Sequence, residues 1–368
     1  MLTQQEITQE TVNKAGVFGQ IDKLGHEQVV FCQDRETGLK AIIAVHSSIL
    51  GPALGGTRFW NYKNEAEALR DVLRLSRGMS YKNSISGIHL GGGKAVIIGD
   101  PAKLSSEAFW RRYGQFVNSL NGKYYTAEDV GTSTADMEYV SLETKYVAGK
   151  PDYLGGGGDP SPFTAYGVYL GMKAAAKKAW GTDSLVGKKV LVEGVGNVGT
   201  FLTERLVAEG AIVYVCDLNE AKLKALANRL PVNVVAPGIA YDLDIDIYAP
   251  CAMGATLDTD NIERLKCRVI AGAANNQLED ELEHGKMLID KGIVYAPDFL
   301  INAGGVINCY MELGGYNRDR AMVGTERIYD RTLEIFAKAE AEGLTPHFAA
   351  LKLAEERIAA IAKLSGKW

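Results

Sequence analysis

Two lysines in a glycine-rich segment have the type and spacing to do chemistry in this chain of 368 residues. Lys82 and Lys94 lie in MSYKNSISGIHLGGGKAVIIGD, and Glu128 and Asp129 follow in TAEDVG. Burial and a second ammonium nearby both lower the pKa of a lysine, so such a lysine can act as a general base near neutral pH. A partly desolvated carboxylate can exchange the complementary proton. The alternative is the usual one for lysine, a strand end that points to solvent.

The segment GGGK at residues 91–94 does not fit a phosphate-binding P-loop. The pattern G-x-x-x-x-G-K-[ST] needs glycine where Ile88 stands, and Ala95 replaces the required serine or threonine. Lys94 therefore needs another explanation.

A second glycine pattern, G-x-G-x-x-G, lies between the strand-like KKVLVE and the helix-like TFLTERLVAEG. In that setting the glycines allow a tight turn, backbone approach to a pyrophosphate and close helix packing, and the helix N-terminus binds the phosphates. The loop comprises Gly194, Val195, Gly196, Asn197, Val198, Gly199 and Thr200. A glycine-rich turn without a nucleotide is the alternative.

Asp217 ends the next strand-like run, AIVYVCD. An acidic side chain there accepts hydrogen bonds from the adenosine ribose hydroxyls. The following residues, Leu218, Asn219 and Glu220, include no arginine to receive a 2′-phosphate. The sequence therefore predicts a site for NAD rather than NADP.

The elements around these motifs predict an α/β protein of two domains: a mixed α/β substrate domain and a doubly wound, Rossmann-type NAD domain, separated by a cleft. We expect the first domain over residues 1–149, completed by a C-terminal helix at 342–368, and the second over 150–341. The Gly- and Pro-rich stretch 149–162 connects them. Expected strands of the first domain are 27–34, 39–47, 94–100 and 123–131, and continuous apolar runs after residue 187 predict a buried parallel sheet.

Composition excludes several classes of function. Net charge is −5, which disfavours nucleic acid and membrane surfaces as partners. The five cysteines form no C-x-x-C pattern and the five histidines do not cluster, so we expect neither a disulfide framework nor a metal site. The polar N-terminus MLTQQEITQE resembles no secretory signal. We expect a cytoplasmic protein.

Nine motifs in the same order, from Glu27 to the C-terminal helix, resemble the amino-acid dehydrogenase superfamily of glutamate, leucine, phenylalanine and valine dehydrogenases, and most nearly its leucine-specific branch. The motifs are GPALGGTRFW, GMSYKN, GGGKAVIIGDP, TAEDVGT, PSPFTAYGVY, EGVGNVG, YAPCAMGA, AANNQL and INAGGVIN. The resemblance implies NAD-dependent, reversible oxidative deamination of an L-amino acid to a 2-oxo acid and ammonia.

The resemblance also implies roles for individual residues. Lys82 would bind the substrate α-carboxylate, Lys94 would activate the water that attacks an iminium intermediate, and Asp129 would carry protons to and from the substrate nitrogen. Backbone at Gly55 and Gly56 would line the carboxylate. Further cofactor positions would be Thr164, Ala252, Asn276 and Asn302, although loop capping is an alternative for the two asparagines.

Leu54 takes the place of a lysine that glutamate-specific relatives use, so an acidic substrate side chain would be buried unpaired. With Leu54, the matching pocket positions are Ala127, Val306 and Cys309, unless Val306 and Cys309 are ordinary core residues. These positions predict a small apolar pocket for leucine, isoleucine or valine, with phenylalanine as the alternative. Cys309 replaces the valine expected in branched-chain members.

Two other functions remain open: an NAD-dependent oxidoreductase acting on hydroxy acids, and a non-catalytic NAD-binding protein. The resemblance implies a homo-oligomer, with an octamer as one form. The resemblance assigns no purpose to an extension of about a dozen residues at the N-terminus.

Overall fold

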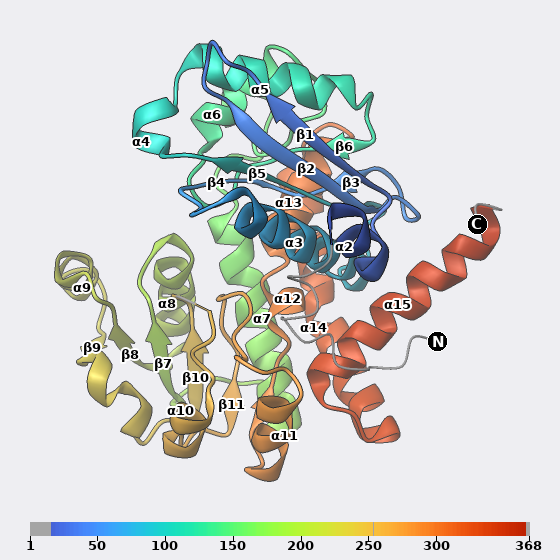
Figure 1. Ribbon diagram of the computed structural model, residues 1–368. Coiled ribbons are helices and arrows are strands. Elements are labelled where there is room, and N and C mark those ends of the chain that lie inside the picture. Colours follow the sequence, from blue (N-terminus) through green and yellow to red (C-terminus); the bar gives the residue numbers. More distant parts are fainter. Residues whose placement is uncertain (1–15, 253, 366–368) are drawn as a thin grey trace. The chain divides into compact units, whose positions relative to one another are not determined.

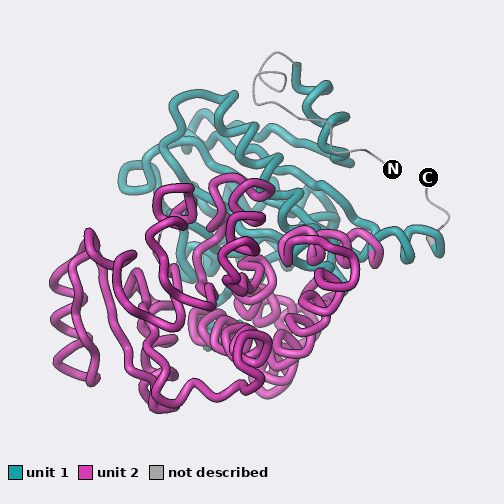
Figure 2. The backbone as a smooth tube through the Cα atoms, turned by 90° about the horizontal axis from the view of Figure 1, so that it is seen from below, with its two compact units in different colours: residues 1–84, 89–158, 358–368 teal, residues 85–88, 159–357 magenta. Residues whose placement is uncertain are grey.

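In the computed structural model, residues 16–252 and 254–365 are described, and the N-terminal extension lies outside them. The chain divides into two compact units (Figure 2). Unit 1 comprises residues 1–84, 89–158 and 358–368, and unit 2 comprises residues 85–88 and 159–357. The sequence had suggested a division at 149/150 and a return to the first domain at 342. The observed division lies at 158/159, after the four glycines, and the return lies within the last helix, at 358.

Unit 1 is a mixed sheet with helices on both faces (Figure 1). Its elements are α2 (Val17–Leu24), β1 (Gln28–Gln33), β2 (Lys40–Ser47), β3 (Ala53–Leu54), β4 (Thr57–Trp60), α3 (Glu65–Ile85), β5 (Gly91–Ile98), α4 (Pro101–Leu104), α5 (Glu107–Ser119), β6 (Tyr124–Tyr125), α6 (Thr134–Ser141) and the 3₁₀ turn Asp152–Leu154. The strand order is β1-β2-β5-β3-β6, and β4 also pairs with β5. β1, β2 and β5 are antiparallel neighbours, whereas β3 and β4 run parallel to β5.

The sheet of unit 1 has a hydrophobic core on each face. Successive residues of a strand point to opposite faces, so neighbouring residues belong to different cores. Ile43, Ala95 and Ile97 join the core beneath α5, whereas Ile42 and Val96 join the core beneath α3. Residues that share the face of Val96 therefore face α3. This is the face on which the candidate catalytic residues lie.

Two expectations for the strands of unit 1 were wrong in their bounds. The glycines at 91–93 belong to β5 itself rather than to a loop before it, because they pair with β2 and β3. The expected strand at 123–131 is regular only at Tyr124–Tyr125 and continues as single bridges at Thr126 and Glu128.

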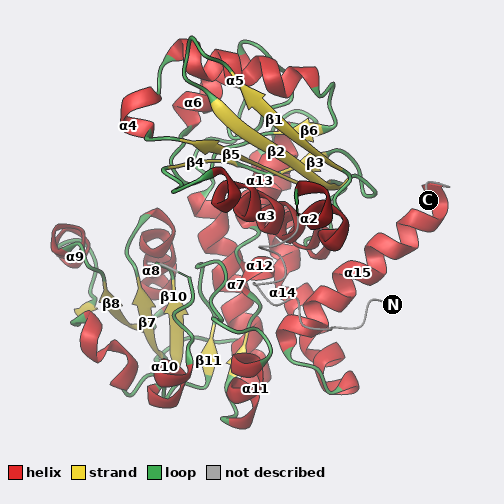
Figure 3. Cartoon of the chain, viewed as in Figure 1, coloured by secondary structure: helices red, strands yellow, loops and turns green. Residues whose placement is uncertain are grey.

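Unit 2 has a six-stranded, entirely parallel sheet of order β12-β11-β10-β7-β8-β9 (Figure 3). Its elements are α7 (Ser161–Trp180), β7 (Lys189–Glu193), α8 (Asn197–Glu209), β8 (Ile212–Cys216), α9 (Glu220–Ala227), β9 (Asn233–Val234), the 3₁₀ turn Pro237–Asp242, β10 (Ile247–Pro250), α10 (Thr259–Arg264), β11 (Val269–Ile270), α11 (Glu283–Asp290), β12 (Val294–Tyr295), α12 (Asp298–Ile301), α13 (Gly304–Glu312), α14 (Arg318–Glu342) and α15 (Pro346–Ser365). Counted from β7, this is the doubly wound order 3-2-1-4-5-6. The predicted fold class is confirmed.

The described residues contain no helix that combines the length and apolarity needed to cross a bilayer. In the same residues, no group of histidine, cysteine, aspartate and glutamate side chains has the arrangement of a metal site. None of the five cysteines, all of which lie in the described part of the chain, forms a disulfide.

Candidate active site

Lys94 lies on β5, where the glycines let α3 pack directly against the strand. A Cβ on Gly92 would lie 2.1 Å from the backbone nitrogen of Ser80 on α3. Because residues two apart on a strand share a face, Lys94 also faces α3. Its side chain is 7% exposed. The strand-end position in solvent, the alternative weighed from the sequence, does not apply to Lys94.

The buried ammonium of Lys94 is paired with a carboxylate. Its Nζ lies 2.8 Å from Oδ2 of Asp129, whose side chain is 24% exposed. Burial raises the pKa of the Asp129 carboxyl, but the positive charges of Lys94 and Arg58 outweigh burial and hold that pKa below its usual value. Asp129 is therefore an anion at neutral pH, able to accept a proton. The sequence predicted that Lys94 lies near a second ammonium, that of Lys82, and near the carboxylates Glu128 and Asp129; the structure shows its pairing with Asp129.

Arg58 on β4 is the residue of this cluster that sequence reasoning missed. Its Nε lies 3.2 Å from Oδ2 of Asp129 and its Nη1 lies 3.0 Å from Oδ2 of Asp71 on α3. Tyr62 donates a hydrogen bond of 2.7 Å to the same oxygen of Asp71. A signal was present in TRFW, since a charged residue within a short buried strand is normally paired. Its partner could not be found from spacing, because Asp129 is 71 residues away.

Lys82 lies in the last turn of α3 and is half-buried. The next residue, Asn83, is buried and donates from Nδ2 to the carbonyl of Gly91 at 2.6 Å. This bond joins the end of α3 to the start of β5. Lys82 on α3 and Lys94 on β5 therefore come from two elements in direct contact. Ser80 contacts Gly92, and each lysine lies two residues further along its own element.

The backbone at Gly55 and Gly56 is enclosed by the same cluster. A Cβ on Gly55 would lie 1.7 Å from the carbonyl oxygen of Gly93, and one on Gly56 would lie 2.9 Å from Cβ of Asp129. Neither position accepts a side chain, so bare backbone borders the ion pair. The two candidate pocket residues of unit 1, Leu54 and Ala127, are close in sequence to Gly55 and Asp129. Both are buried: Leu54 is 1% and Ala127 6% exposed.

In unit 2 the glycine loop joins β7 to α8 at the point where the strand order reverses, between β7 and β10. A Cβ on Gly199 would lie 1.9 Å from the carbonyl oxygen of Gly194, and one on Gly194, where φ is +96°, would lie 2.8 Å from Cβ of Ala252. An added Cβ on Gly196 meets no atom within 4 Å. The outer glycines are required by the fold, whereas the middle one leaves a space beside the start of α8. Such a space suits a pyrophosphate.

Asp217 follows β8 and contacts the glycine loop directly. Its Oδ2 accepts a hydrogen bond of 2.8 Å from the backbone N–H of Val195, and its Oδ1 accepts one of 2.8 Å from Asn219. Asp217 therefore holds the loop, and it directly follows β8, where the sequence predicts a ribose contact. The loop and this carboxylate together fit a dinucleotide.

The remaining predicted cofactor residues lie on loops and helix ends of unit 2. Asn302 donates from Nδ2 to Ala273 O at 3.0 Å and to Asn275 Oδ1 at 2.8 Å, so the amide does cap a loop. Asn276 is exposed with φ of +52°, and Thr164 is half-buried on α7. Ala252 is exposed, and on α13 Val306 is half-buried and Cys309 buried.

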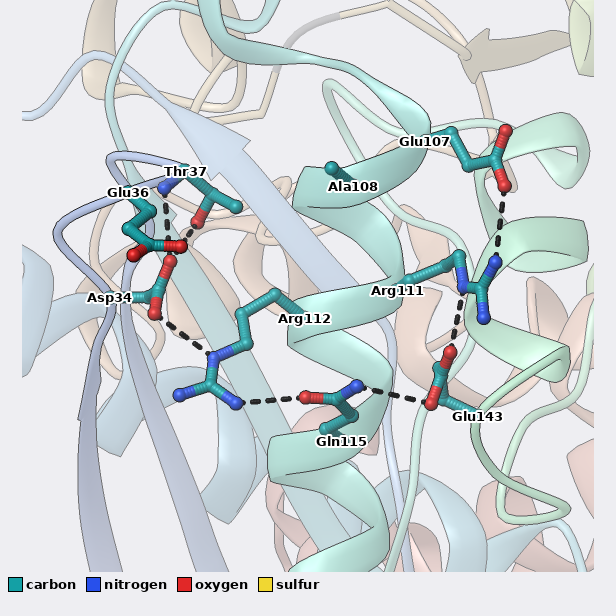
Figure 4. Close-up of a pocket in the computed structure, with 9 residues that line it drawn as sticks. All are labelled: Asp34, Glu36, Thr37, Glu107, Ala108, Arg111, Arg112, Gln115 and Glu143. Carbon is teal, nitrogen blue, oxygen red and sulfur yellow. Dashed lines mark hydrogen bonds and ion pairs between the residues drawn. The ribbon is translucent and has the colours of Figure 1, made fainter.

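A surface hollow of about 760 Å³ in unit 1 is separate from this cluster (Figure 4). It is lined by α5, the β1–β2 turn and Glu143, and most of its charged side chains pair among themselves. Arg112 contacts Asp34 at 3.1 Å, and Arg111 contacts Glu143 at 2.7 Å (Figure 4). These partly exposed pairs join the turn and α5 to their neighbours, and we assign no ligand to the hollow.

Comparison with known proteins decides the family. Residues 26–146 match the model "Glu/Leu/Phe/Val dehydrogenase, dimerisation domain", and residues 214–345 match "Glutamate/Leucine/Phenylalanine/Valine dehydrogenase". The chain belongs to the Glu/Leu/Phe/Val dehydrogenase family.

Relatives in this family cover nearly the whole chain. The chain is 54% identical to a leucine dehydrogenase of Thermoactinomyces intermedius, over 93% of both chains. It is 51% identical to a valine dehydrogenase of Streptomyces albus, over 92% of this chain and 93% of the relative. The crystal structure of L-tryptophan dehydrogenase from Nostoc punctiforme matches with a TM-score of 0.82 and 44% identity, over 94% of this chain and 99% of the other. The chain is an amino-acid dehydrogenase, and dehydrogenases of this family use a nicotinamide cofactor.

Proposed function

We propose that this dehydrogenase catalyses the NAD-dependent, reversible oxidative deamination of branched-chain L-amino acids, leucine above isoleucine and valine, to 2-oxo acids and ammonia. The buried pair of Lys94 and Asp129, 2.8 Å apart and bordered by bare backbone, is the observation that carries the proposal. A lysine and a carboxylate in contact can take up and release protons between water and a substrate amine.

Each residue of the cluster receives one role. Lys82 binds the substrate α-carboxylate, with the backbone of Gly55 and Gly56 beside it. Asp129 accepts a proton from the substrate ammonium and later returns one to the departing ammonia. Lys94, in its neutral amine form, takes a proton from the water that adds to the iminium carbon, and the ammonium so formed stabilises the negative charge that develops on oxygen. When held by the glycine loop and Asp217, NAD would supply the oxidant for the hydride that leaves the substrate α-carbon.

The preference for NAD over NADP rests on Asp217. Its carboxylate would accept the ribose hydroxyls, and a 2′-phosphate there would meet like charge. Thr164, Ala252, Asn276 and Asn302 are proposed as further cofactor contacts.

Replacing Asp217 by alanine is expected to weaken NAD binding by about 10- to 100-fold, the loss of one or two charge-assisted hydrogen bonds. Discrimination against NADP should relax at the same time. Titration of both dinucleotides measures the two effects. Asp244→Ala, which removes an exposed carboxylate of the same unit, is the matched control. An unchanged NAD/NADP ratio in Asp217→Ala would contradict the ribose role.

Two alanine variants of the glycine loop separate binding from folding. Gly196→Ala is expected to leave the melting temperature unchanged, because the added Cβ meets no protein atom, and to weaken NAD binding at least about tenfold by occupying the pyrophosphate space. Gly199→Ala is expected to destabilise the protein by about 1–3 kcal/mol through overpacking. Thermal unfolding with NAD titration measures both. Equal NAD affinity in Gly196→Ala and wild type would show that the pyrophosphate lies elsewhere.

The substrate side chain is proposed to be apolar and branched. Leu54 and Ala127 are buried and carry no charge that could pair an acidic substrate, and Val306 and Cys309 are proposed as the other pocket positions. The relatives named above include a valine and a tryptophan dehydrogenase, so valine or an aromatic amino acid such as phenylalanine is the alternative within the family.

One assay tests this function. The protein is mixed with NAD and single L-amino acids or 2-hydroxy acids, and NADH is followed by absorbance. We expect turnover with L-leucine, with kcat/KM highest among the branched-chain substrates. Highest kcat/KM with phenylalanine or valine would favour the alternatives, turnover only with hydroxy acids would show a different oxidoreductase, and none at all would favour a non-catalytic NAD-binding protein.

We further propose a homo-oligomer, up to an octamer, because the first matched domain is described as a dimerisation domain. Light scattering in solution gives the number of subunits. We propose a cytoplasmic location because the five cysteines, all within the described residues, form no disulfide, as is usual in reducing compartments.

A further inference from the structure

Two cations from different strands contact a single oxygen of the candidate proton-carrying residue. Nζ of Lys94 on β5 and Nε of Arg58 on β4 lie 2.8 Å and 3.2 Å from Oδ2 of Asp129. Lys94 is the proposed acid–base residue, but the proposed reaction gives Arg58 no task. Its guanidinium stays protonated, so it cannot exchange protons.

Arg58 is itself held from the opposite side. Its Nη1 lies 3.0 Å from Oδ2 of Asp71, a side chain that is 16% exposed. Tyr62, which is 8% exposed, donates to the same oxygen at 2.7 Å. The guanidinium therefore bridges two carboxylates with two of its nitrogens, which the planar fork of arginine permits and the single nitrogen of lysine does not.

The carboxylate that Arg58 contacts follows the isolated bridge at Glu128 and belongs to a turn rather than to a regular strand. The turn is closed by a hydrogen bond of 2.8 Å from the backbone N–H of Asp129 to Oγ1 of Thr132. This bond fixes the backbone but leaves the side-chain torsions to other contacts. Two cations approaching one oxygen from different strands restrict those torsions.

We propose that Arg58 is a positioning residue for amino-acid deamination: anchored by Asp71 and Tyr62, it holds the carboxylate of Asp129 against Lys94 in the orientation that receives the substrate proton. Arg58 acts through Asp129 and touches no reacting atom. The inference rests on the proposed function, and it adds a requirement for Arg58, Asp71 and Tyr62 that the function alone does not contain.

The test compares kcat, KM and pH profiles for NAD-dependent leucine oxidation. Arg58→Gln is expected to lower kcat by roughly 10- to 100-fold, the usual cost of a displaced catalytic group, and to change the KM for leucine much less. The charged and titratable groups around Asp129 are Lys94, Arg58, Asp71 and Tyr62. The positive charge of Arg58 lowers the pKa of Asp129 against the effect of burial, so its removal should raise that pKa. The acid limb of the kcat/KM profile should therefore move to higher pH.

Two variants separate charge from geometry. Arg58→Lys keeps the charge but cannot bridge both carboxylates, so the acid limb should stay near that of the wild type while kcat remains low. Arg112→Gln is the matched control: it makes the same exchange in the partly exposed pair with Asp34 and should behave as wild type.

Every outcome bears on the proposal. A wild-type kcat and acid limb in Arg58→Gln would overturn it, and an effect confined to the KM for leucine would make Arg58 a substrate-binding residue instead. If Arg58→Gln fails to fold, Tyr62→Phe and Arg58→Lys decide: reduced kcat at a wild-type melting temperature supports the proposal, and unchanged kcat in both refutes it. Absence of leucine turnover in the wild type would refute the proposed function, which is a separate result.

Discussion

Replacing Lys94 by alanine is expected to lower kcat for leucine oxidation by about 10²- to 10⁴-fold, the usual contribution of a general acid–base residue. The side chain of Lys94 is buried and in contact with Asp129. A lysine on the surface therefore cannot replace its amine in the reaction. NAD affinity should be unchanged, because the glycine loop and Asp217 belong to unit 2. Steady-state kinetics and NAD titration measure the two quantities.

The matched control for this variant is Lys103→Ala. Lys103 belongs to the same unit, and its side chain is 80% exposed beside Asp100, so kcat should equal that of the wild type. Full activity in Lys94→Ala at a normal melting temperature would remove Lys94 from the mechanism.

Replacing Asp129 by asparagine is expected to have an effect of the same order on kcat, about 10²- to 10⁴-fold, because asparagine has nearly the same shape but cannot accept the substrate proton. It should also destabilise the protein by about 3–5 kcal/mol, since the ammonium of Lys94 is left buried without its carboxylate. Kinetics and chemical denaturation at neutral pH measure the two losses. A variant that loses stability but keeps kcat would show a structural role only.

The lowered pKa of Asp129 also predicts that the stability difference between wild type and Asp129→Asn depends on pH. The pKa of Asp129 is lowered in the folded protein relative to its ordinary value of 3.8. Ionisation of this group therefore stabilises the fold above about pH 4, and that contribution is lost as pH falls through the lowered pKa. The difference in unfolding free energy between wild type and Asp129→Asn should thus shrink on acidification. A constant difference down to pH 3 would contradict the lowered pKa.

Much of unit 2 could be predicted from the sequence, because its signals are local. The strand, the glycine loop and the following helix are consecutive, and the loop needs positive φ at Gly194 and close packing at Gly199, both of which only glycine supplies. Asp217 was found for the same reason, at the end of the next strand. The second function of its carboxylate, the hydrogen bond from Val195, depends on two neighbouring strands and had no local signal.

The bounds of β5 show where local reasoning fails. Three consecutive glycines indicate a loop, since glycine weakens a strand. They form a strand here because they pair with β2 and β3. They must be glycines because Ser80, Tyr124 and the carbonyl of Ser47 come too close to Gly92, Gly93 and Gly91 for any side chain. Those neighbours come from other elements, so the reason for the glycines appears only in the folded chain.

By itself the sequence determined the order of the elements, the doubly wound unit with its glycine loop, and the lysines and the carboxylate that are candidates for the site, since each is a pattern of nearby residues. Only the tertiary structure decided that Lys94 pairs with Asp129, and that Arg58 shares that carboxylate and bridges to Asp71. These side chains come from β5, a turn, β4 and α3, and they meet because β4 pairs with β5 and α3 packs on the face that Arg58 and Lys94 share. Ion pairs depend on distance in space, and residues 71 positions apart acquire that distance only when the sheet has formed.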